Sequence, residues 1–334
     1  MSHFLILKSN FKQMKNKLGL IFSIVLLLLL VGLIAGDLFL EKPKPQKNIY
    51  EYDLKELRKV DSSLIAYKEV FSFKINSEAV FGLAIDAEDR IYVSGTDKLW
   101  IFDSQGQVQS SMKVRGDAHA VSISESGNIL LGVGNRVDVR KPDGGLNNSF
   151  QIKGAKAYIS SLVEREGHVF IADAGQKIVH QYTIDGNKIN IIGAKNLDKG
   201  IRGFVIPSPY FDLMFGRQGE LWVVNPGRHA LEAYNDKGDL ISSWERTSMQ
   251  VDGFGGCCNP SHVAMLSDGS FVTSEKGLER IKIHLPSGDF KSVVAAPNQF
   301  DAGTTGLDLA VDSNDRIIVL DPSRKMVRIF ELKY

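Results

Sequence analysis

The sequence lacks the residues and motifs that mark several large protein classes. Two cysteines in 334 residues exclude a disulfide scaffold and multi-cysteine zinc or iron–sulfur sites. Neither sign of charge dominates: 40 lysines and arginines stand against 39 acidic residues, which argues against a nucleic-acid binder and an acidic disordered tail. A phosphate-binding glycine loop, a nucleophile elbow and a Cys-x-x-Cys pair are also missing. What remains is an ordinary globular composition.

The N-terminus joins a cluster of like charge to a long apolar run. Four basic residues and no acidic residue precede residue 18: Lys8, Lys12, Lys15 and Lys17. Leu18–Gly36 then continues for 19 residues without a charge. A helix of that length rises about 28 Å, close to the ~30 Å hydrocarbon core of a bilayer. We therefore expect a transmembrane signal-anchor helix over residues 18–40.

These charges also set the expected orientation. The positive-inside rule places the basic tail, residues 1–17, in the cytoplasm and the chain after Asp37 outside the cytoplasmic (inner) membrane, in a periplasm or its equivalent. A cleaved signal peptide is the alternative, but its apolar region normally has 7–15 residues, and residues 33–37 make a poor cleavage site. Residues 41–64 should form a linker, with an extended spacer over 41–49 and a short helix near Glu51–Val60.

The rest of the chain uses one pattern six times. The first and last copies show it most clearly, as three short apolar runs each: Gly82–Asp86, Arg90–Ser94 and Leu99–Phe102, then Asp308–Asp312, Arg316–Leu320 and Val327–Phe330. In every copy the last apolar residue of the first run and the first apolar residue of the second are six positions apart, as in Ile85 and Ile91. Turn-forming residues fill the interval, which predicts antiparallel hairpins.

Four short strands per copy and six copies predict an all-β fold, a six-bladed β-propeller over residues 65–334. The segment gives about 45 residues per copy, within the range of known blade repeats. The last copy ends after three strands, whereas an apolar stretch, Tyr67–Ile75, precedes the first copy. We expect this stretch to complete the last blade and close the ring, which removes open sheet edges.

On these motifs, residues 65–334 resemble the NHL-repeat family of six-bladed propellers, in an NHL/TolB-like fold. The segments Arg90-Ile-Tyr-Val93, Ile171–Ile178 and Leu320–Phe330 carry the resemblance, although the asparagine–histidine pair that names the family is absent. The N-terminal helix would make the chain a membrane-anchored, bacterial-type member. Relatives include calcium-dependent lactonases and a zinc-dependent lyase, so the resemblance allows a divalent metal, Ca²⁺ or Zn²⁺, as cofactor, but fold alone does not give function.

The strand register predicts which side chains face the central channel. One position in each inner strand should point there: Gly82, Ala120, Ser160, Asp212, His262 and Asp308. Neighbouring blades thus place Asp212, His262 and Asp308 on one arc, where they can ligate a metal or act as acid and base. The alternative is a wet channel lined by polar residues without a ligand.

Two long connections, Gly193–Tyr210 and Glu245–Pro260, fall on the same face of the propeller. The second contains Phe254-Gly-Gly-Cys-Cys-Asn-Pro260, with both cysteines of the chain side by side. Outside the cytoplasm such a pair favours a disulfide, as a rigid platform or a reducible switch, while a plain structural turn is the alternative. The residues expected to form a ligand-binding face are Cys257, Cys258, Asn259, Tyr210 and His119.

The expected function is binding. The propeller would serve as a binding or scaffold module, holding a protein partner in or near the membrane, or a small ligand, at the face with the long connections. No nucleic-acid partner is expected. The alternatives are a metal-dependent hydrolase or lyase working in the central channel and a redox-responsive module that uses Cys257 and Cys258.

Overall fold

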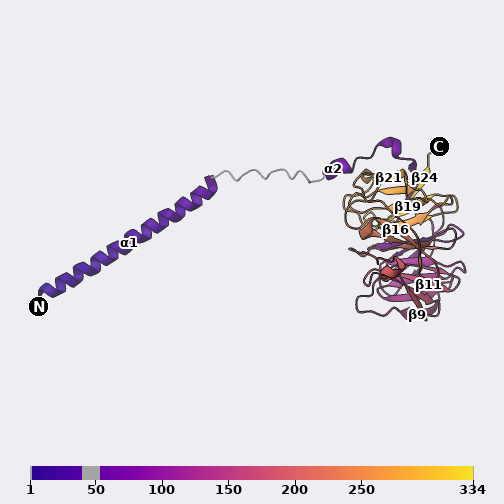
Figure 1. The fold of residues 1–334 in the computed structure, drawn as a ribbon, viewed down its shortest axis with the longest axis horizontal. Helices are drawn as coiled ribbons and strands as arrows, with labels where there is room; N and C mark the ends of the chain where they lie inside the picture. The colour runs from indigo at the N-terminus through magenta and orange to yellow at the C-terminus, as the bar shows by residue number, and fades with distance from the viewer. Residues whose placement is uncertain (1, 40–52, 334) are drawn as a thin grey trace. The chain divides into compact units, whose positions relative to one another are not determined.

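The structure is a computed structural model that describes residues 2–39 and 53–333 (Figure 1). The chain divides into two compact units, Met1–Tyr52 and Asp53–Tyr334, which we describe separately. The predicted spacer over residues 41–49 lies outside the described residues.

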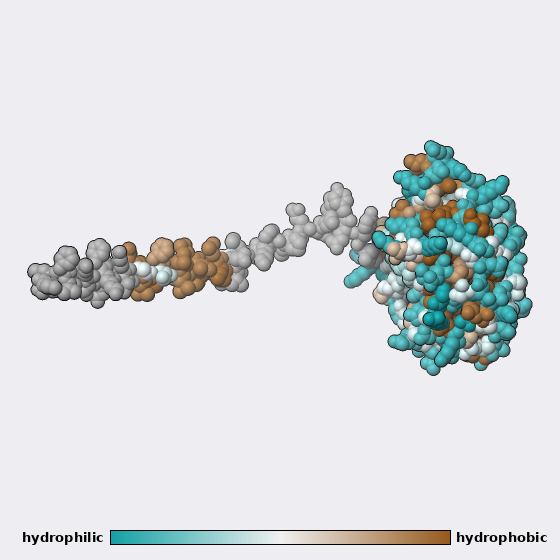
Figure 2. Space-filling view, turned by 90° about the horizontal axis from the view of Figure 1, so that it is seen from below, coloured by the Kyte–Doolittle hydropathy of each residue, from teal (hydrophilic) through white to brown (hydrophobic). Residues whose placement is uncertain are grey.

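The first unit contains one long helix, α1 (Ser2–Phe39). Its segment Lys17–Gly36 is long and apolar enough to cross a membrane, and none of it is buried by other parts of the structure. Figure 2 shows this segment as a mostly brown band. A helix suits the segment because it satisfies its own backbone hydrogen bonds without water. The predicted apolar helix is confirmed, although a signal sequence would meet the same criteria of length and composition.

The linker helix is shorter than Glu51–Val60. The described part forms one turn, α2 (Leu54–Leu57), and a 3₁₀ turn, η1 (Ser62–Leu64). An isolated helix of this length has little stability of its own, so tertiary contacts decide where it ends. Directly after α2, the Arg58 guanidinium donates to the carboxylate of Glu279 and to the carbonyl oxygens of Gly277 and Pro297. Arg58 thus fastens the start of the second unit to the propeller.

The second unit consists of six four-stranded antiparallel sheets, which confirms the predicted fold class. Blade 1 consists of β2 (Val80–Ile85), β3 (Ile91–Gly95), β4 (Lys98–Phe102) and β5 (Val108–Lys113). Blade 2 consists of β6 (Ala120–Ile123), β7 (Ile129–Val133), β8 (Arg136–Arg140) and β9 (Leu146–Gln151). Blade 3 consists of β10 (Ile159–Arg165), β11 (His168–Asp173), β12 (Ile178–Thr183) and β13 (Lys188–Ile192). Blade 4 consists of β14 (Leu213–Phe215), β15 (Leu221–Asn225), β16 (Ala230–Tyr234) and β17 (Leu240–Glu245). Blade 5 consists of β18 (His262–Met265), β19 (Phe271–Ser274), β20 (Ile281–His284) and β21 (Phe290–Ala295).

Blade 6 joins the two ends of the propeller chain. It is made of β22 (Asp308–Val311), β23 (Ile317–Asp321), β24 (Met326–Leu332) and β1 (Tyr67–Lys74). The outer strand β1 pairs with β24 from Tyr67 opposite Leu332 to Lys74 opposite Met326. The prediction that the N-terminal strand completes the last blade is confirmed.

The hydrophobic core lies between blades. One buried cluster, for example, joins Val93 and Trp100 of blade 1 to Ile318 and Leu320 of blade 6. The second strands are buried along most of their length, while the outer strand β5 is mostly exposed. Each blade therefore buries its apolar residues only when its two neighbours are present.

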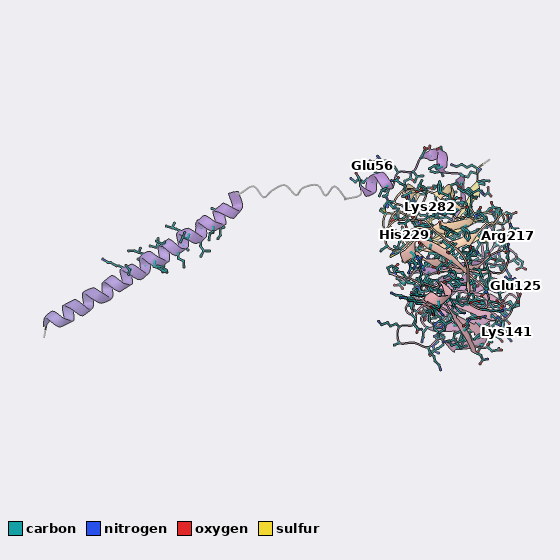
Figure 3. The ribbon with its side chains drawn as sticks, viewed as in Figure 1. Glu56, Glu125, Lys141, Arg217, His229 and Lys282 are labelled. Carbon is teal, nitrogen blue, oxygen red and sulfur yellow. The ribbon has the colours of Figure 1, made fainter. Side chains whose placement is uncertain are left out.

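The propeller has two unlike faces. One carries the short turns between first and second strands, and we call it the hairpin face. The other carries the connections between blades, of which 193–212, 246–261 and 296–307 are long, and we call it the loop face. Figure 3 shows His229 at the loop face and Arg217, Glu125 and Lys141 at the hairpin face. The third long connection was not predicted as part of a site.

Candidate functional site

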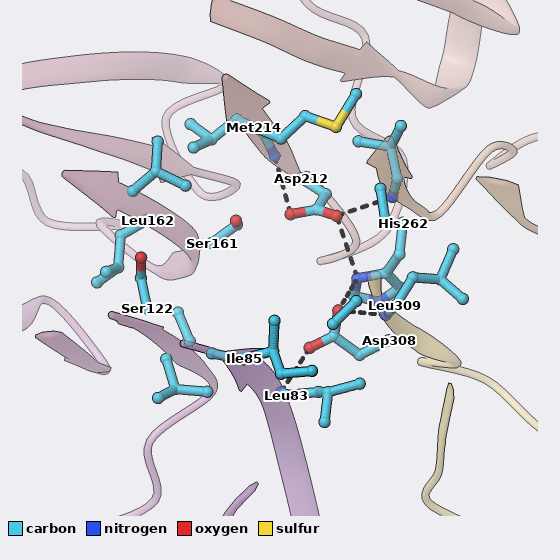
Figure 4. A pocket seen from close by; sticks show the side chains of 18 of the residues that line it. Leu83, Ile85, Ser122, Ser161, Leu162, Asp212, Met214, His262, Asp308 and Leu309 are labelled. Carbon is cyan, nitrogen blue, oxygen red and sulfur yellow. Dashed lines mark hydrogen bonds and ion pairs between the residues drawn. The ribbon is translucent and has the colours of Figure 1, made fainter. Parts of the chain in front are cut away.

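Three ionisable side chains meet in the central channel, and we call them the central triad: Asp212, His262 and Asp308 (Figure 4). The three residues lie at or next to the starts of the inner strands β14, β18 and β22. The Nδ1 atom of His262 is 3.3 Å from Oδ1 of Asp308 and 3.6 Å from Oδ2 of Asp212. One ligand atom from each residue lies within 4.8 Å of the other two.

At three of the channel positions a side chain also bonds to the next blade. Oδ2 of Asp212 accepts a hydrogen bond from the backbone N–H of Val263 at 2.9 Å, and Oδ2 of Asp308 accepts one from Leu83 at 2.7 Å. In blade 3, the Ser160 hydroxyl donates to the carbonyl of Phe211 at 2.6 Å. Each of these bonds crosses a seam between blades. The triad carboxylates therefore have a structural role whether or not they also bind a ligand.

The triad holds a proton firmly. Burial lowers the pKa of His262, but the charge of Asp308 and the hydrogen bonds to Asp212 and Asp308 outweigh burial and raise this pKa to about 10. At neutral pH the imidazole is therefore charged and paired with two carboxylates. Its Nε2 atom is buried and has no hydrogen-bond partner among the described residues.

The donor set of the triad suits one metal better than another. Calcium takes six to eight oxygen ligands, whereas the triad offers two carboxylates and a nitrogen. Zinc in catalytic sites takes three protein ligands of this kind and leaves a fourth position for water. The Nδ1 atom of His262 would have to lose its proton before it could ligate zinc. Of the two predicted cofactors, the residues fit Zn²⁺; that a metal binds stays a prediction.

A cavity of about 380 Å³ opens on the loop face beside the triad, and we call it the cup. Five aromatic or imidazole side chains line it: Phe81, His119, Tyr158, Tyr210 and His262. Neighbouring rings lie close together around the mouth. The centroid distances are 4.4 Å between Phe81 and His119, 5.5 Å between His119 and Tyr158, and 5.8 Å between Tyr210 and His262. His262 also lines a second cavity of about 310 Å³ in the channel below. His119 and Ser160 also line both cavities, so the cup and the channel meet at these three residues.

The residues expected on the ligand-binding face occupy different environments. His119 and Tyr210 line the cup. Asn259 is buried, and its amide group donates to the carbonyl oxygens of Gly255 and Lys276 and accepts from the N–H of Lys276. Asn259 therefore holds the 246–261 connection together. Cys257 is exposed and Cys258 buried, and both are free thiols rather than the disulfide that the sequence favoured.

Phe81 and Tyr158 were not predicted as site residues. Four of the cup residues stand one or two positions before the channel position of their blade: Phe81, His119, Tyr158 and Tyr210. An aromatic or histidine ring at that position in four successive blades is the signal that could have identified them. The offset is one residue for Phe81 and His119 and two residues for Tyr158 and Tyr210, so no single position marks all four.

A buried ionic cluster supports the 246–261 connection from below. The fully buried Lys282 donates to the carbonyl of Gly253, lies 4.4 Å from the ring centroid of Phe254 and is 3.1 Å from Oε2 of Glu275. Arg280 also pairs with Glu275, at 2.8 Å. Burial lowers the pKa of Lys282 to about 8 despite the charge of Glu275. Burying these charged groups costs desolvation free energy. The cluster that bears this cost lies under the connection with the two cysteines and holds it in place.

Comparison with known proteins gives a fold and no family. No protein-family model and no curated protein matches the sequence. A solved structure of virginiamycin B lyase from Staphylococcus aureus is 10% identical, with a TM-score of 0.57 over 80% of this chain and 100% of its own. A streptogramin B lyase structure is also 10% identical, with a TM-score of 0.56 over 80% of this chain and 97% of its own. A protein of unknown function from Bacteroides caccae is 11% identical, with a TM-score of 0.55 over 69% and 87%. Identities this low show the six-bladed fold alone.

Proposed function

We propose that the protein binds a small, flat ligand in the cup on the loop face of its propeller. The observation that carries this proposal is the cup itself: a cavity of about 380 Å³ whose rings come from blade after blade around the channel mouth. Small-molecule sites are typically concave, mostly apolar and about 300–1,000 Å³ in volume. The faces and edges of aromatic side chains favour stacking with a planar group.

The charges around the cup indicate a ligand with little net charge. Glu78 lines the cup, and the Nζ atom of Lys276 lies 5.4 Å from the ring centroid of Tyr210, so the rim carries one charge of each sign. In the triad below, two carboxylates face one charged imidazole. The whole site is thus within about one charge of neutrality, which favours an uncharged ring system with a few polar groups over a highly charged ligand.

Thermal-shift screening of the full chain in detergent tests this proposal. The probes are planar, uncharged heteroaromatic compounds, and native mass spectrometry of the purified protein looks for a co-purified compound of the same kind. A compound that raises the melting temperature should bind at least tenfold more weakly to Tyr158→Ala, because an aromatic contact is lost. The matched control is Phe71→Ala, which removes an exposed ring of β1 outside the cup. Equal weakening in both variants, or no binding of any probe, would contradict the proposal.

A metal-dependent lyase or hydrolase is the second candidate, and the central triad favours it. Asp212, His262 through Nδ1 and Asp308 are the residues that would hold Zn²⁺. Bound there, the metal would supply a Lewis acid or an activated water. Two structural neighbours are described as lyases, which agrees with this candidate but adds little at 10% identity.

Metal analysis of the full chain separates the two candidates. Asp212→Asn keeps an oxygen that can accept from Val263 N–H but removes the negative charge a metal needs. If the protein is a metalloenzyme, stoichiometric zinc will be present and will be lost in Asp212→Asn. It will remain in the control, Asp239→Asn, whose carboxylate pairs with Lys199 at the surface. Substoichiometric zinc in the wild type would remove this candidate.

We further infer that the protein is a membrane-anchored, divergent NHL-type propeller. The uncharged run Leu18–Gly36 and the lysines before it support a cytoplasmic N-terminus and a propeller outside the inner membrane. In that location a protein partner in or beside the membrane is the alternative occupant of the loop face.

A further inference from the structure

The adjacent cysteines form a second reactive site beside the cup. Their Sγ atoms are 3.0 Å apart, about 1 Å more than the length of a disulfide bond. Cys257 is exposed at the surface of the 246–261 connection, while Cys258 is only 2% exposed. One sulfur is therefore open to a reagent, and the other lies directly behind it.

The surroundings make Cys258 easier to ionise than Cys257. A hydrogen bond to Cys258 raises the pKa of the Cys257 thiol. Burial raises the pKa of Cys258, but the hydrogen bond from Cys257, together with Ser208 and the positive charge of Lys276, more than offsets burial and leaves this pKa below its usual value. Lys276 itself donates to the Ser208 hydroxyl at 3.0 Å. Of the two sulfurs, Cys258 is therefore the one whose ionised form the surroundings favour, and Cys257 is the one that keeps its proton.

We propose that Cys257 and Cys258 form a dithiol site that exchanges with small aliphatic disulfides and cycles between a dithiol and a vicinal disulfide. The reaction starts from the form of the pair in which Cys258 has lost its proton. The Cys257 proton passes to Cys258, and the Cys257 thiolate attacks one sulfur of the small disulfide, releasing a small thiolate. That thiolate takes the proton from Cys258. The Cys258 thiolate then attacks Cys257 and releases the second small thiolate. The protein loses two electrons and one proton, and the small disulfide is reduced to one thiol and one thiolate.

Oxidation of the ionised pair changes the charge at the rim of the cup. When Cys258 is ionised, the reduced pair carries one negative charge near Lys276, and the disulfide carries none. Ser208, which bonds Lys276, is followed directly by Pro209 and Tyr210 of the cup lining. An uncompensated Lys276 would therefore stand 5.4 Å from the Tyr210 ring centroid. An effect on ligand binding rests on the proposed function, but the exchange reaction does not.

Thiol counting in glutathione buffers tests the exchange on the full chain in detergent. The protein is equilibrated at fixed ratios of reduced to oxidised glutathione, alkylated under denaturing conditions and weighed by mass spectrometry. We expect both thiols to disappear together, with a mass decrease of two hydrogens and no retained glutathione. Retained glutathione on one cysteine, or two free thiols at every ratio, would overturn the proposal. Neither readout depends on a cup ligand, so failure of the proposed function would be seen separately.

A charge variant tests whether Lys276 sets the equilibrium. Because Lys276 stabilises the reduced thiolate, Lys276→Met should favour the disulfide and shift the exchange constant with glutathione about tenfold, which corresponds to about 30 mV. The matched control is Lys291→Met, which removes a lysine that pairs with Asp268 on another part of the propeller and should leave the constant unchanged. Equal constants for the two variants would show that the pair does not have the charge environment described here.

Discussion

At the scale of single residues, the most informative side chain outside the site is His284 in β20. It is fully buried, and its ring lies 5.3 Å from that of Trp244 and 5.0 Å from that of Phe254. Other blades hold Phe102, Tyr234 or Phe330 at this place, so the sequence already indicated a packed ring, and the structure confirms it. Unlike the aromatic residues at this place in other blades, a histidine can also bind a proton. Burial, assisted by the charge of Lys282, lowers the pKa of His284 to about 3.

This pKa predicts an acid-dependent loss of stability. Between pH 6.5 and about 3 the unfolded chain binds a proton at His284 that the folded protein excludes, so the free energy of unfolding falls as the pH falls through that window. His284→Phe should remove this part of the loss while keeping the packed ring. Urea unfolding at pH 7, 5 and 4 measures it. If the variant and the wild type lose stability equally between pH 7 and 4, His284 is not held neutral in the folded protein.

At the scale of elements, the long connections depend on glycines in left-handed backbone conformations. In the 193–212 connection, Gly193 has φ +74° and Gly200 has φ +72°. A Cβ on Gly193 would lie 1.9 Å from the ring of Phe204, whereas a Cβ on Gly200 would meet nothing within 4 Å. Phe204 is buried against Phe211 and Tyr234, so its ring cannot move aside easily. Substitutions at the two glycines would therefore share the backbone strain but differ in steric overlap, which only a side chain at Gly193 would cause.

Gly193→Ala should destabilise the protein more than Gly200→Ala. Each substitution forces alanine into the left-handed region, which costs about 1–2 kcal/mol. Only Gly193→Ala adds overlap with a buried ring, so we expect its total cost to exceed that of Gly200→Ala by at least about 2 kcal/mol. Denaturant unfolding of both variants provides the comparison. Similar losses would mean that Phe204 moves aside freely and that the connection is more plastic than its packing indicates.

At the scale of the whole molecule, some features depend on residues that are neighbours in the sequence and others on residues that only the fold brings together. Each hairpin is specified by its own apolar runs and turn residues, and six repetitions made the propeller predictable, including the closing role of β1. The cup could not be predicted in the same way, because its rings come from the ends of several blades and stand at different offsets from the channel positions. Lys282 was also unpredictable, since its sequence neighbours do not show that a connection will cover it.

The N-terminal helix leads to a prediction about the whole chain in its cell. If α1 is an uncleaved anchor, the protein will stay with membranes after alkaline extraction, and its intact mass will still include Leu18–Gly36. A variant lacking residues 2–39 should be extracted. In spheroplasts, after mild reduction, a membrane-impermeant maleimide should label the exposed Cys257 of the wild type but not of Cys257→Ser. A mature chain that begins after Gly36 would identify a signal peptide instead, and labelling only after lysis would reverse the orientation.

If α1 is an uncleaved anchor, the contacts of Arg58 have a mechanical consequence for the propeller. A pull applied from the N-terminal side reaches Arg58, with its bonds to Glu279, Gly277 and Pro297, before it reaches β1. Those bonds belong to blade 5 and the connection that follows it, so the load passes into a blade made of continuous chain. The closing strand β1, which pairs with β24 in blade 6, is relieved of part of that load. Arg58 thus protects the closure of the ring, because a force from the N-terminal side must break its bonds before it can pull on β1 in full.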